Sequence, residues 1–171
     1  NRTVWAGLQG TTLYLATQDA GEGNDVFLLL AGAPGALTAA PWGKAGQAMA
    51  WKAFLADEND NAFCGWFNDA QSQTFTATKA AATGANGGVL EGTIDLAQLF
   101  GSRPDSVMLA AVAYGTANGG AMVASQQAPA GNGNGTLEAS EFVTVRLCSL
   151  TGTCCPSDLD GSGSEIGRAH V

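Results

Sequence analysis

Short apolar runs recur along residues 1–147, separated by clusters of Gly, Asn, Asp and Pro. Alternating apolar and polar residues are typical of strands that bury one face, whereas an unbroken short apolar run is typical of strands that bury both faces. Residues 11–18 alternate around Leu13 and Leu15, and residues 26–30 are apolar throughout. We therefore predict a hairpin of two strands across the polar turn between them, with the second strand covered on both sides.

The remaining strand candidates have similar lengths and lie between turn-forming segments. They cover residues 49–55, 62–67, 74–78, 89–94, 106–114, 121–126 and 141–147. Between residues 31 and 46, two prolines and several glycines predict an ordered surface loop. One short helical turn is expected at 95–100, because Asp95 can cap it and Gly101 can end it.

The recurrence of about eight to ten short strands predicts an all-β fold. We expect residues 1–147 to form an antiparallel β-sandwich, jelly-roll-like, with the one short helical turn. The composition changes after Cys148 and strand periodicity stops, so we expect a domain boundary near 148–156 and an irregular C-terminal tail.

The charge balance narrows the range of partners. Charged residues make up 13% of the chain, with 7 Lys and Arg against 15 Asp and Glu, for a formal net charge of -8. So acidic a chain lacks the basic surface that nucleic-acid phosphates or anionic membranes attract. No apolar run reaches about 18 residues, so we also expect no membrane span. Because the chain begins at Asn1 without a leader, we expect a signal peptide to have been removed or to lie upstream.

The four cysteines form an even set, which favours disulfide bonds over a zinc site. Disulfide bonds in turn favour a secreted or cell-surface protein. The adjacent Cys154 and Cys155 lack the spacing of zinc ligands. Cys148 and Cys154 enclose a span short enough to close a disulfide, which leaves Cys64 to meet Cys155 if the tail folds back. The alternatives are a Cys64–Cys148 bond and a Cys64 buried as a small hydrophobic residue.

The order of these elements resembles the CBM9-like and DOMON-like family of extracellular β-sandwiches. The similarity lies in TLYLATQDAGEGNDVFLLL near the start, CGWFNDA in the centre and VLEGTIDLAQLFGSRPDSVMLAAVAY after it. It extends over residues 5–147. The resemblance implies an accessory module that binds sugar or haem, but likeness of fold does not transfer a ligand. Haem is disfavoured because this region holds no histidine to ligate the iron.

The tail contains a more specific motif. The segment CPSDLDGSG resembles the start of a dockerin-like calcium repeat, with Asp158, Asp160 and Ser162 at loop positions one, three and five and Gly163 at six. The glutamate of position twelve is missing, so residues 148–165 hold an incomplete calcium loop that we expect to be disordered from Pro156 and to bind calcium weakly. In the intact protein, the resemblance implies a complete repeat that attaches to a cohesin-like or cell-surface partner.

The last six residues, 166–171, read IGRAHV, which matches the translation of a sequencing adapter. We expect them to be an artefact at the end of a metagenomic fragment. The only histidine of the chain, His170, belongs to this segment. Without it, neither a Ser-His-Asp nor a Cys-His arrangement can be assembled. Glu58 and Glu91 are a candidate carboxylate pair for glycoside cleavage. We interpret both as solvated surface charges.

Ligand-binding candidates are aromatic or oxygen-rich. Trp42 follows Pro41 in a loop and is the best candidate for a sugar-stacking platform, and the alternative is a loop tryptophan that plugs the end of the sandwich. Trp66 is the second candidate, although strand patterns favour core packing for both Trp51 and Trp66. A second calcium candidate, apart from the tail, is the oxygen-rich turn segment after residue 18. Its side-chain ligands would be Asp19, Glu22, Asn24 and Asp25. Ordinary turn chemistry explains this segment equally well.

These observations predict a protein that is not an enzyme. The leading hypothesis is a non-catalytic binding or accessory module of a secreted, modular bacterial protein, with a glycan as the ligand. The alternative is a structural adhesion or assembly domain without a small-molecule ligand. Exposed aromatic rings beside polar side chains would favour the first hypothesis, and four buried tryptophans would favour the second.

Overall fold

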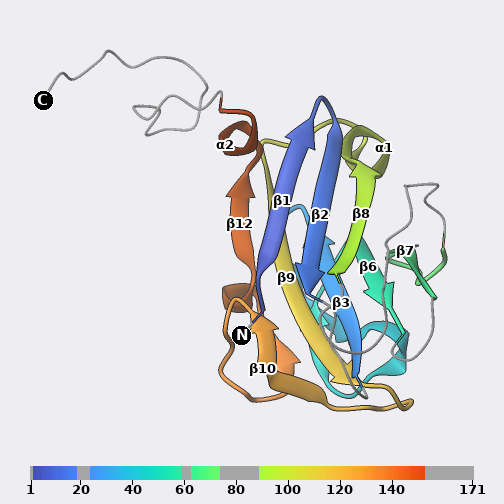
Figure 1. Ribbon diagram of the computed structural model, residues 1–171. Coiled ribbons are helices and arrows are strands. Elements are labelled where there is room, and N and C mark those ends of the chain that lie inside the picture. Colours follow the sequence, from blue (N-terminus) through green and yellow to red (C-terminus); the bar gives the residue numbers. More distant parts are fainter. Residues whose placement is uncertain (1, 19–23, 59–62, 74–88, 153–171) are drawn as a thin grey trace, which may run out of the picture.

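The computed structural model describes residues 2–18, 24–58, 63–73 and 89–152, and these form an antiparallel β-sandwich (Figure 1). The strands are β1 (Val4–Gln9), β2 (Thr12–Gln18), β3 (Asn24–Ala31), β4 (Leu37–Ala39), β5 (Gln47–Met49), β6 (Ala53–Asp57), β7 (Cys64–Asn68), β8 (Val89–Asp95), β9 (Ser106–Gly115), β10 (Met122–Ala128), β11 (Thr136–Leu137) and β12 (Val143–Arg146). The helical elements are α1 (Leu96–Phe100), α2 (Leu147–Thr151) and the 3-10 turns η1 (Pro41–Gly43) and η2 (Ala139–Glu141). The predicted all-β sandwich is confirmed. The strand predicted at 74–78 lies outside the described residues.

Three sheets lie in layers. The strands β1, β2 and β8 form one sheet, in that order, and the largest sheet has the order β10-β9-β3-β6-β7, with β12 also paired to β9. A small third sheet, β11-β5-β4, contains the one parallel pair among the described strands, β11 with β5. The large sheet occupies the middle, because one hydrophobic cluster packs it against the β1-β2-β8 sheet and a second packs it against the layer that contains β5 and β11.

The central strand β3 is apolar on both faces because both faces are covered. Phe27 and Leu29 point into the second cluster, while Leu28 and Leu30 point into the first, and all four are fully buried. On either side, β3 pairs with β6 and β9, which are buried in the same two-sided way. The prediction of a doubly covered strand at residues 26–30 is therefore confirmed.

The predicted hairpin between residues 11 and 30 is wrong. The strand β2 pairs with β1 and β8, whereas β3 belongs to the other sheet. A strand buried on both faces must lie inside the sandwich, so β3 cannot pair with a strand of the one-sided outer sheet. The hairpin that does form joins β1 to β2, in register from Gln9 opposite Thr12, with Gly10 at a positive φ of 61° in the turn.

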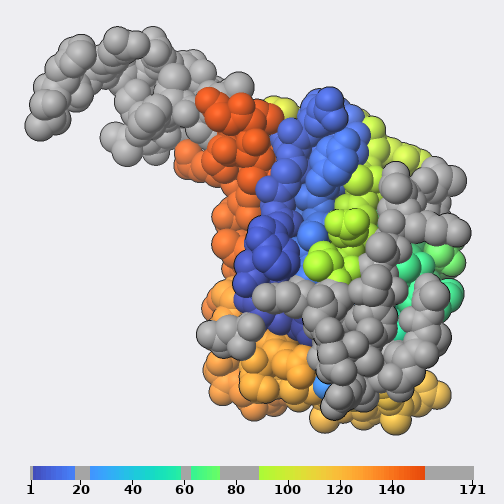
Figure 2. Space-filling view, viewed as in Figure 1, coloured from blue at the N-terminus to red at the C-terminus, as the bar shows by residue number. Residues whose placement is uncertain are grey.

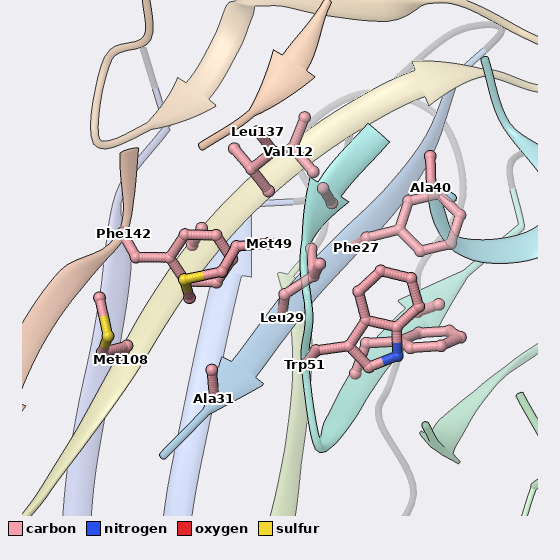
Figure 3. Close-up of a cluster of buried hydrophobic side chains, with 14 of the residues drawn as sticks. Phe27, Leu29, Ala31, Ala40, Met49, Trp51, Met108, Val112, Leu137 and Phe142 are labelled. Carbon is pink, nitrogen blue, oxygen red and sulfur yellow. The ribbon is translucent and has the colours of Figure 1, made fainter. Parts of the chain in front are cut away.

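The second cluster shows how the covering layer is held. Figure 3 shows Phe27, Leu29 and Val112 from the large sheet meeting Met49 and Leu137 from the covering segments. Trp51 joins this cluster and is 6% exposed, with its ring edge-to-face against Phe54 at 5.7 Å between centroids. Core packing, as expected for Trp51, is confirmed. The predicted strand 49–55 is in fact two strands, since the chain bends at residues 50–52 to bring this ring under the sheet.

Within the described ranges, helical structure is limited to single turns. The helix α1 begins where Asp95 accepts a hydrogen bond from the Gln98 backbone N–H and ends at the left-handed Gly101, as predicted. Hydrogen bonds from Gln98 and Thr11 hold the pKa of the Asp95 carboxyl below its usual value. The helix α2 was not predicted. It forms where we expected an irregular tail to begin, because Leu147 buries its side chain in the first cluster. No described helix is long enough to cross a membrane.

Leu28 tests the two-sided core. It is fully buried at the centre of β3, so Leu28→Ala should leave a cavity and lower the free energy of unfolding by about 2–5 kcal/mol. Leu37 is 45% exposed, and Leu37→Ala should change the same quantity by less than about 0.5 kcal/mol. Urea denaturation of both variants measures this. Similar losses at the two positions would contradict the layered packing.

Ionisation of Tyr114 should make the free energy of unfolding depend on pH. Burial, with the Glu141 charge as a second cause, raises the pKa of its hydroxyl to about 12 from the usual 10. The unfolded chain therefore loses this proton first, so the contribution of Tyr114 to stability is complete below pH 10 and falls between pH 10 and 12. The loss should be on the order of 2–3 kcal/mol. Tyr114→Phe should decline less over this range in urea titrations, and equal declines would show that the hydroxyl is not desolvated.

Candidate functional site

The outer face of the β1-β2-β8 sheet carries two exposed aromatic side chains, Trp5 and Tyr14. Trp5 is 49% exposed and Tyr14 is 44% exposed. Both lie on the side of the sheet opposite the first cluster, because their neighbours along the strands pack into that cluster and successive residues of a strand point to opposite faces. These inward residues are Val4, Ala6 and Leu8 on β1 and Leu13 and Leu15 on β2. The strands β1, β2 and β8 face the viewer in Figure 2, so the reader looks onto this surface.

The register of the three strands places small residues beside the rings. Trp5 lies opposite Ala16, which lies opposite Glu91 on β8. In the next outward-facing row, Gly7 lies opposite Tyr14, which lies opposite Thr93. Trp5 and Tyr14 are thus diagonal neighbours on adjacent strands, close enough for aromatic side chains to share one ligand. Between them a depression of about 510 Å³ opens over Ala16 and Gly7.

The described polar side chains that line this depression can form hydrogen bonds, and none of them is basic. Glu91 and Thr93 form its wall on the β8 side, and the Tyr14 hydroxyl donates to the Gln9 side-chain oxygen over 3.2 Å. Glu91 is exposed. Among the described residues, the lining includes one carboxylate and no Lys or Arg. The face therefore offers ring surfaces, hydroxyls and one negative charge.

The structure corrects the prediction for Trp66. It is 2% exposed and belongs to the first cluster, so it presents no ring face to a ligand. Gly92 makes this possible, since a Cβ at that position would lie 2.8 Å from the Trp66 indole nitrogen. The side chain of Trp66 therefore lies beneath β8, on the inner side of the candidate face. It supports the sheet from inside and is not part of its surface.

Trp42 lies on the opposite side of the large sheet from the candidate face. It is half-buried in η1, at a positive φ of 52°, and its ring packs edge-to-face on Phe27 and Phe67 at 5.0 and 5.1 Å between centroids. It also lines a smaller cavity of about 290 Å³ with Phe63 and Glu58. Most of the ring surface is used in this aromatic packing. The position of Trp42 therefore fits the alternative, in which a loop tryptophan plugs the end of the sandwich.

The carboxylates are dispersed. Glu58 and Glu91 line different cavities and do not form a pair around one of them. Of the predicted calcium turn, Asp19 and Glu22 lie outside the described residues, and Asp25 bonds the Lys44 ammonium. Asp158, Asp160 and Ser162 also lie outside them. In the described ranges no three His, Cys, Asp or Glu side chains gather as a metal site would require.

The predicted pairing of Cys64 is wrong, whereas the Cys148–Cys154 bond stays a prediction. Cys148 is disulfide-bonded, and its partner lies outside the described residues, as do Cys154 and Cys155. Cys64 is a thiol and not half of a disulfide, so the Cys64–Cys155 and Cys64–Cys148 pairings are both wrong. It lies partly buried on β7, against the first cluster. The alternative of a cysteine packed as a small hydrophobic residue describes this position, because Cys64 packs against buried apolar side chains.

Sequence reasoning missed both aromatic residues of the candidate face. The alternation around Tyr14 was visible, but the pattern does not show whether the polar side of a strand faces solvent or another layer. Trp5 had no signal of its own, because β1 was not predicted. A search for aromatic residues at outward positions of alternating strands would have found Tyr14.

The exposed and buried aromatic residues should differ in their effect on stability. Trp5→Ala and Tyr14→Ala should each change the free energy of unfolding by less than about 1 kcal/mol, as surface substitutions usually do. Trp66→Ala should lower it by about 3–5 kcal/mol, because it empties a core position. Thermal or urea denaturation compares them. A large loss at Trp5 would mean that its ring is structural.

No protein-family model, curated protein or solved structure matches this chain. The function of the chain is therefore inferred from the geometry of the β1-β2-β8 face.

Proposed function

We propose that this chain is a non-catalytic binding module that holds a neutral glycan on the outer face of the β1-β2-β8 sheet. The observation that carries the proposal is the exposure of Trp5 and Tyr14 on one sheet face, beside a depression over Ala16. Burying large rings is favourable, so two neighbouring exposed rings on one regular sheet face suggest a surface that is covered by a ligand.

A sugar fits this surface chemically. The apolar face of a pyranose ring can pack on an aromatic ring, while its hydroxyls need hydrogen-bond partners at the edge. Trp5 and Tyr14 offer the rings, and Glu91 and Thr93 offer oxygen atoms on the far wall of the same depression. Because the rings lie on paired strands, they are held in place before the ligand arrives, which lowers the entropy lost on binding.

The negative charge of the site and of the chain favours neutral glycans over anionic ones. The part of the lining that the structure describes has a carboxylate and no basic residue, and the whole chain carries a formal charge of -8. An anionic polysaccharide or a nucleic acid would be repelled by both. The proposed ligand is therefore an uncharged, hydroxyl-rich polysaccharide, and Glu91 accepts hydrogen bonds from its hydroxyls.

The proposed setting is a secreted or cell-surface modular protein. The disulfide at Cys148 supports export, because disulfides persist mainly in oxidising compartments. The dockerin-like motif at Asp158 supports a modular parent, in which the tail attaches to a partner while the sandwich binds the glycan.

The test uses affinity electrophoresis and calorimetry with hydroxyethylcellulose, xyloglucan and arabinoxylan, and with polygalacturonate as the anionic control. At least one neutral polymer should bind, and polygalacturonate should not. Trp5→Ala should weaken that binding about tenfold or more, since a buried aromatic contact is commonly worth over 1 kcal/mol. EDTA should leave the affinity unchanged, because the lining contains a single carboxylate.

The matched control is Phe63→Ala, which removes an aromatic side chain of similar exposure, 43%, far from the depression. It should bind like the unaltered chain. Ala16→Glu should abolish binding while both rings remain, because it fills the depression and adds charge. If none of the neutral polymers binds, the alternative of an adhesion or assembly domain without a small ligand is favoured and the present proposal fails.

A further inference from the structure

A buried lysine and a buried aspartate lie in contact at one end of the large sheet. The Lys44 ammonium nitrogen is 2.7 Å from the Asp25 carboxylate, and the two side chains are only 3% and 5% exposed. Asp25 lies near the start of β3, and Lys44 directly follows η1. The contact therefore joins the central sheet to the segment that covers its second face.

The lysine side chain is held in one position. Besides Asp25, its nitrogen donates to the carbonyl oxygens of Gly115, Thr116 and Ala117, over 2.8, 2.9 and 3.2 Å. The backbone N–H of Ala45 also donates to the Gly120 carbonyl, so the whole segment is anchored on the turn between β9 and β10. With so many contacts, the nitrogen stays beside the carboxylate of Asp25.

A second carboxylate faces Asp25 across the sheet. Val26 pairs with Asp57 in the antiparallel register, so Asp25 and Glu58 occupy the next facing positions, on the same face. Glu58 lines the cavity of about 290 Å³ that also reaches Asp25 and Lys44. Glu58 itself is exposed at this cavity, which gives it contact with water.

The surroundings of the pair are aromatic. Phe27 follows in β3, Tyr114 lies directly opposite Asp25 on β9, and Trp42 and Phe67 line the same cavity. Burial among apolar rings keeps bulk water away from both side chains. A carboxylic acid and a neutral amine in contact can condense to an amide.

We propose that Lys44 and Asp25 form an intramolecular isopeptide bond, with Glu58 as the proton-transfer partner. Glu58 accepts one proton from the Lys44 ammonium. The nitrogen lone pair then forms the N–C bond to Asp25 Cγ, and the C–O bond breaks, its electron pair leaving with oxygen. That oxygen takes the proton held by Glu58 and a second proton from the nitrogen, and departs as water. Ammonium and carboxylate become amide and water, with no oxidant or cofactor.

Confinement of the two groups makes the condensation feasible. Groups held within contact react as if at effective concentrations of about 10⁵–10⁸ M, which offsets the poor equilibrium of amide formation in water. The open cavity gives the released water an exit. Afterwards Thr116 and Ala117, which lie in an exposed turn, can bond solvent instead.

The experiment is the mass of the reduced and alkylated full chain, since the Cys148 disulfide also alters the mass. The expected mass is lower by one water than the mass calculated for the alkylated sequence. Acylated Lys44 should resist trypsin, so the digest should contain a peptide of residues 3–52, lighter by one water, and none ending at residue 44. Chymotrypsin, which cuts between the two residues, should leave two peptides joined.

Three controls make the result specific. Lys44→Arg keeps the cation but should restore the full sequence mass. Glu58→Gln alters an exposed side chain and should slow or abolish the bond, and a bond formed at the unaltered rate would overturn the role of Glu58. The exposed pair Lys52 and Asp69, 3.5 Å apart and 55% exposed, should remain uncondensed. A full sequence mass with normal cleavage after Lys44 would overturn the proposal and leave a simple buried ion pair.

Discussion

The structure depends on the burial of both faces of the β3-β9 pair. Once these two strands lie inside, other layers have to cover both of their faces. The β1-β2-β8 sheet covers the face with Leu28, and the layer with Met49 and Leu137 covers the face with Phe27. The two clusters share one sheet, so a loss of packing on either side exposes strands that have no polar face to turn toward water.

This constraint also creates the candidate glycan site. A sheet that covers a core with one face turns its other face to solvent, and paired strands hold outward side chains in fixed rows. Trp5 and Tyr14 are rigidly presented for that reason, while Trp66 supports the same sheet from inside because Gly92 leaves room for its ring. A tryptophan of the core and a tryptophan of the surface thus act on opposite faces of one sheet.

The other side of the sandwich is organised around charge. The segment after η1 brings Lys44 into an aromatic environment where water cannot solvate it, so Asp25 and three carbonyl oxygens take the place of solvent. Asp25, expected in a calcium turn, bonds a cation that belongs to the chain itself. The contact ties the covering layer to the central sheet.

Local patterns determined much of this protein: the all-β class, the doubly buried strand at 26–30, the capped turn from Asp95 to Gly101 and the core position of Trp51. These follow from residue periodicity and capping, which act over a few positions. The partners of β2, the thiol of Cys64, the helix α2 and the exposure of Trp5 did not follow from any local pattern. Each depends on which distant strand lies beside a segment, because burial and pairing are set by the layers and not by neighbours along the chain.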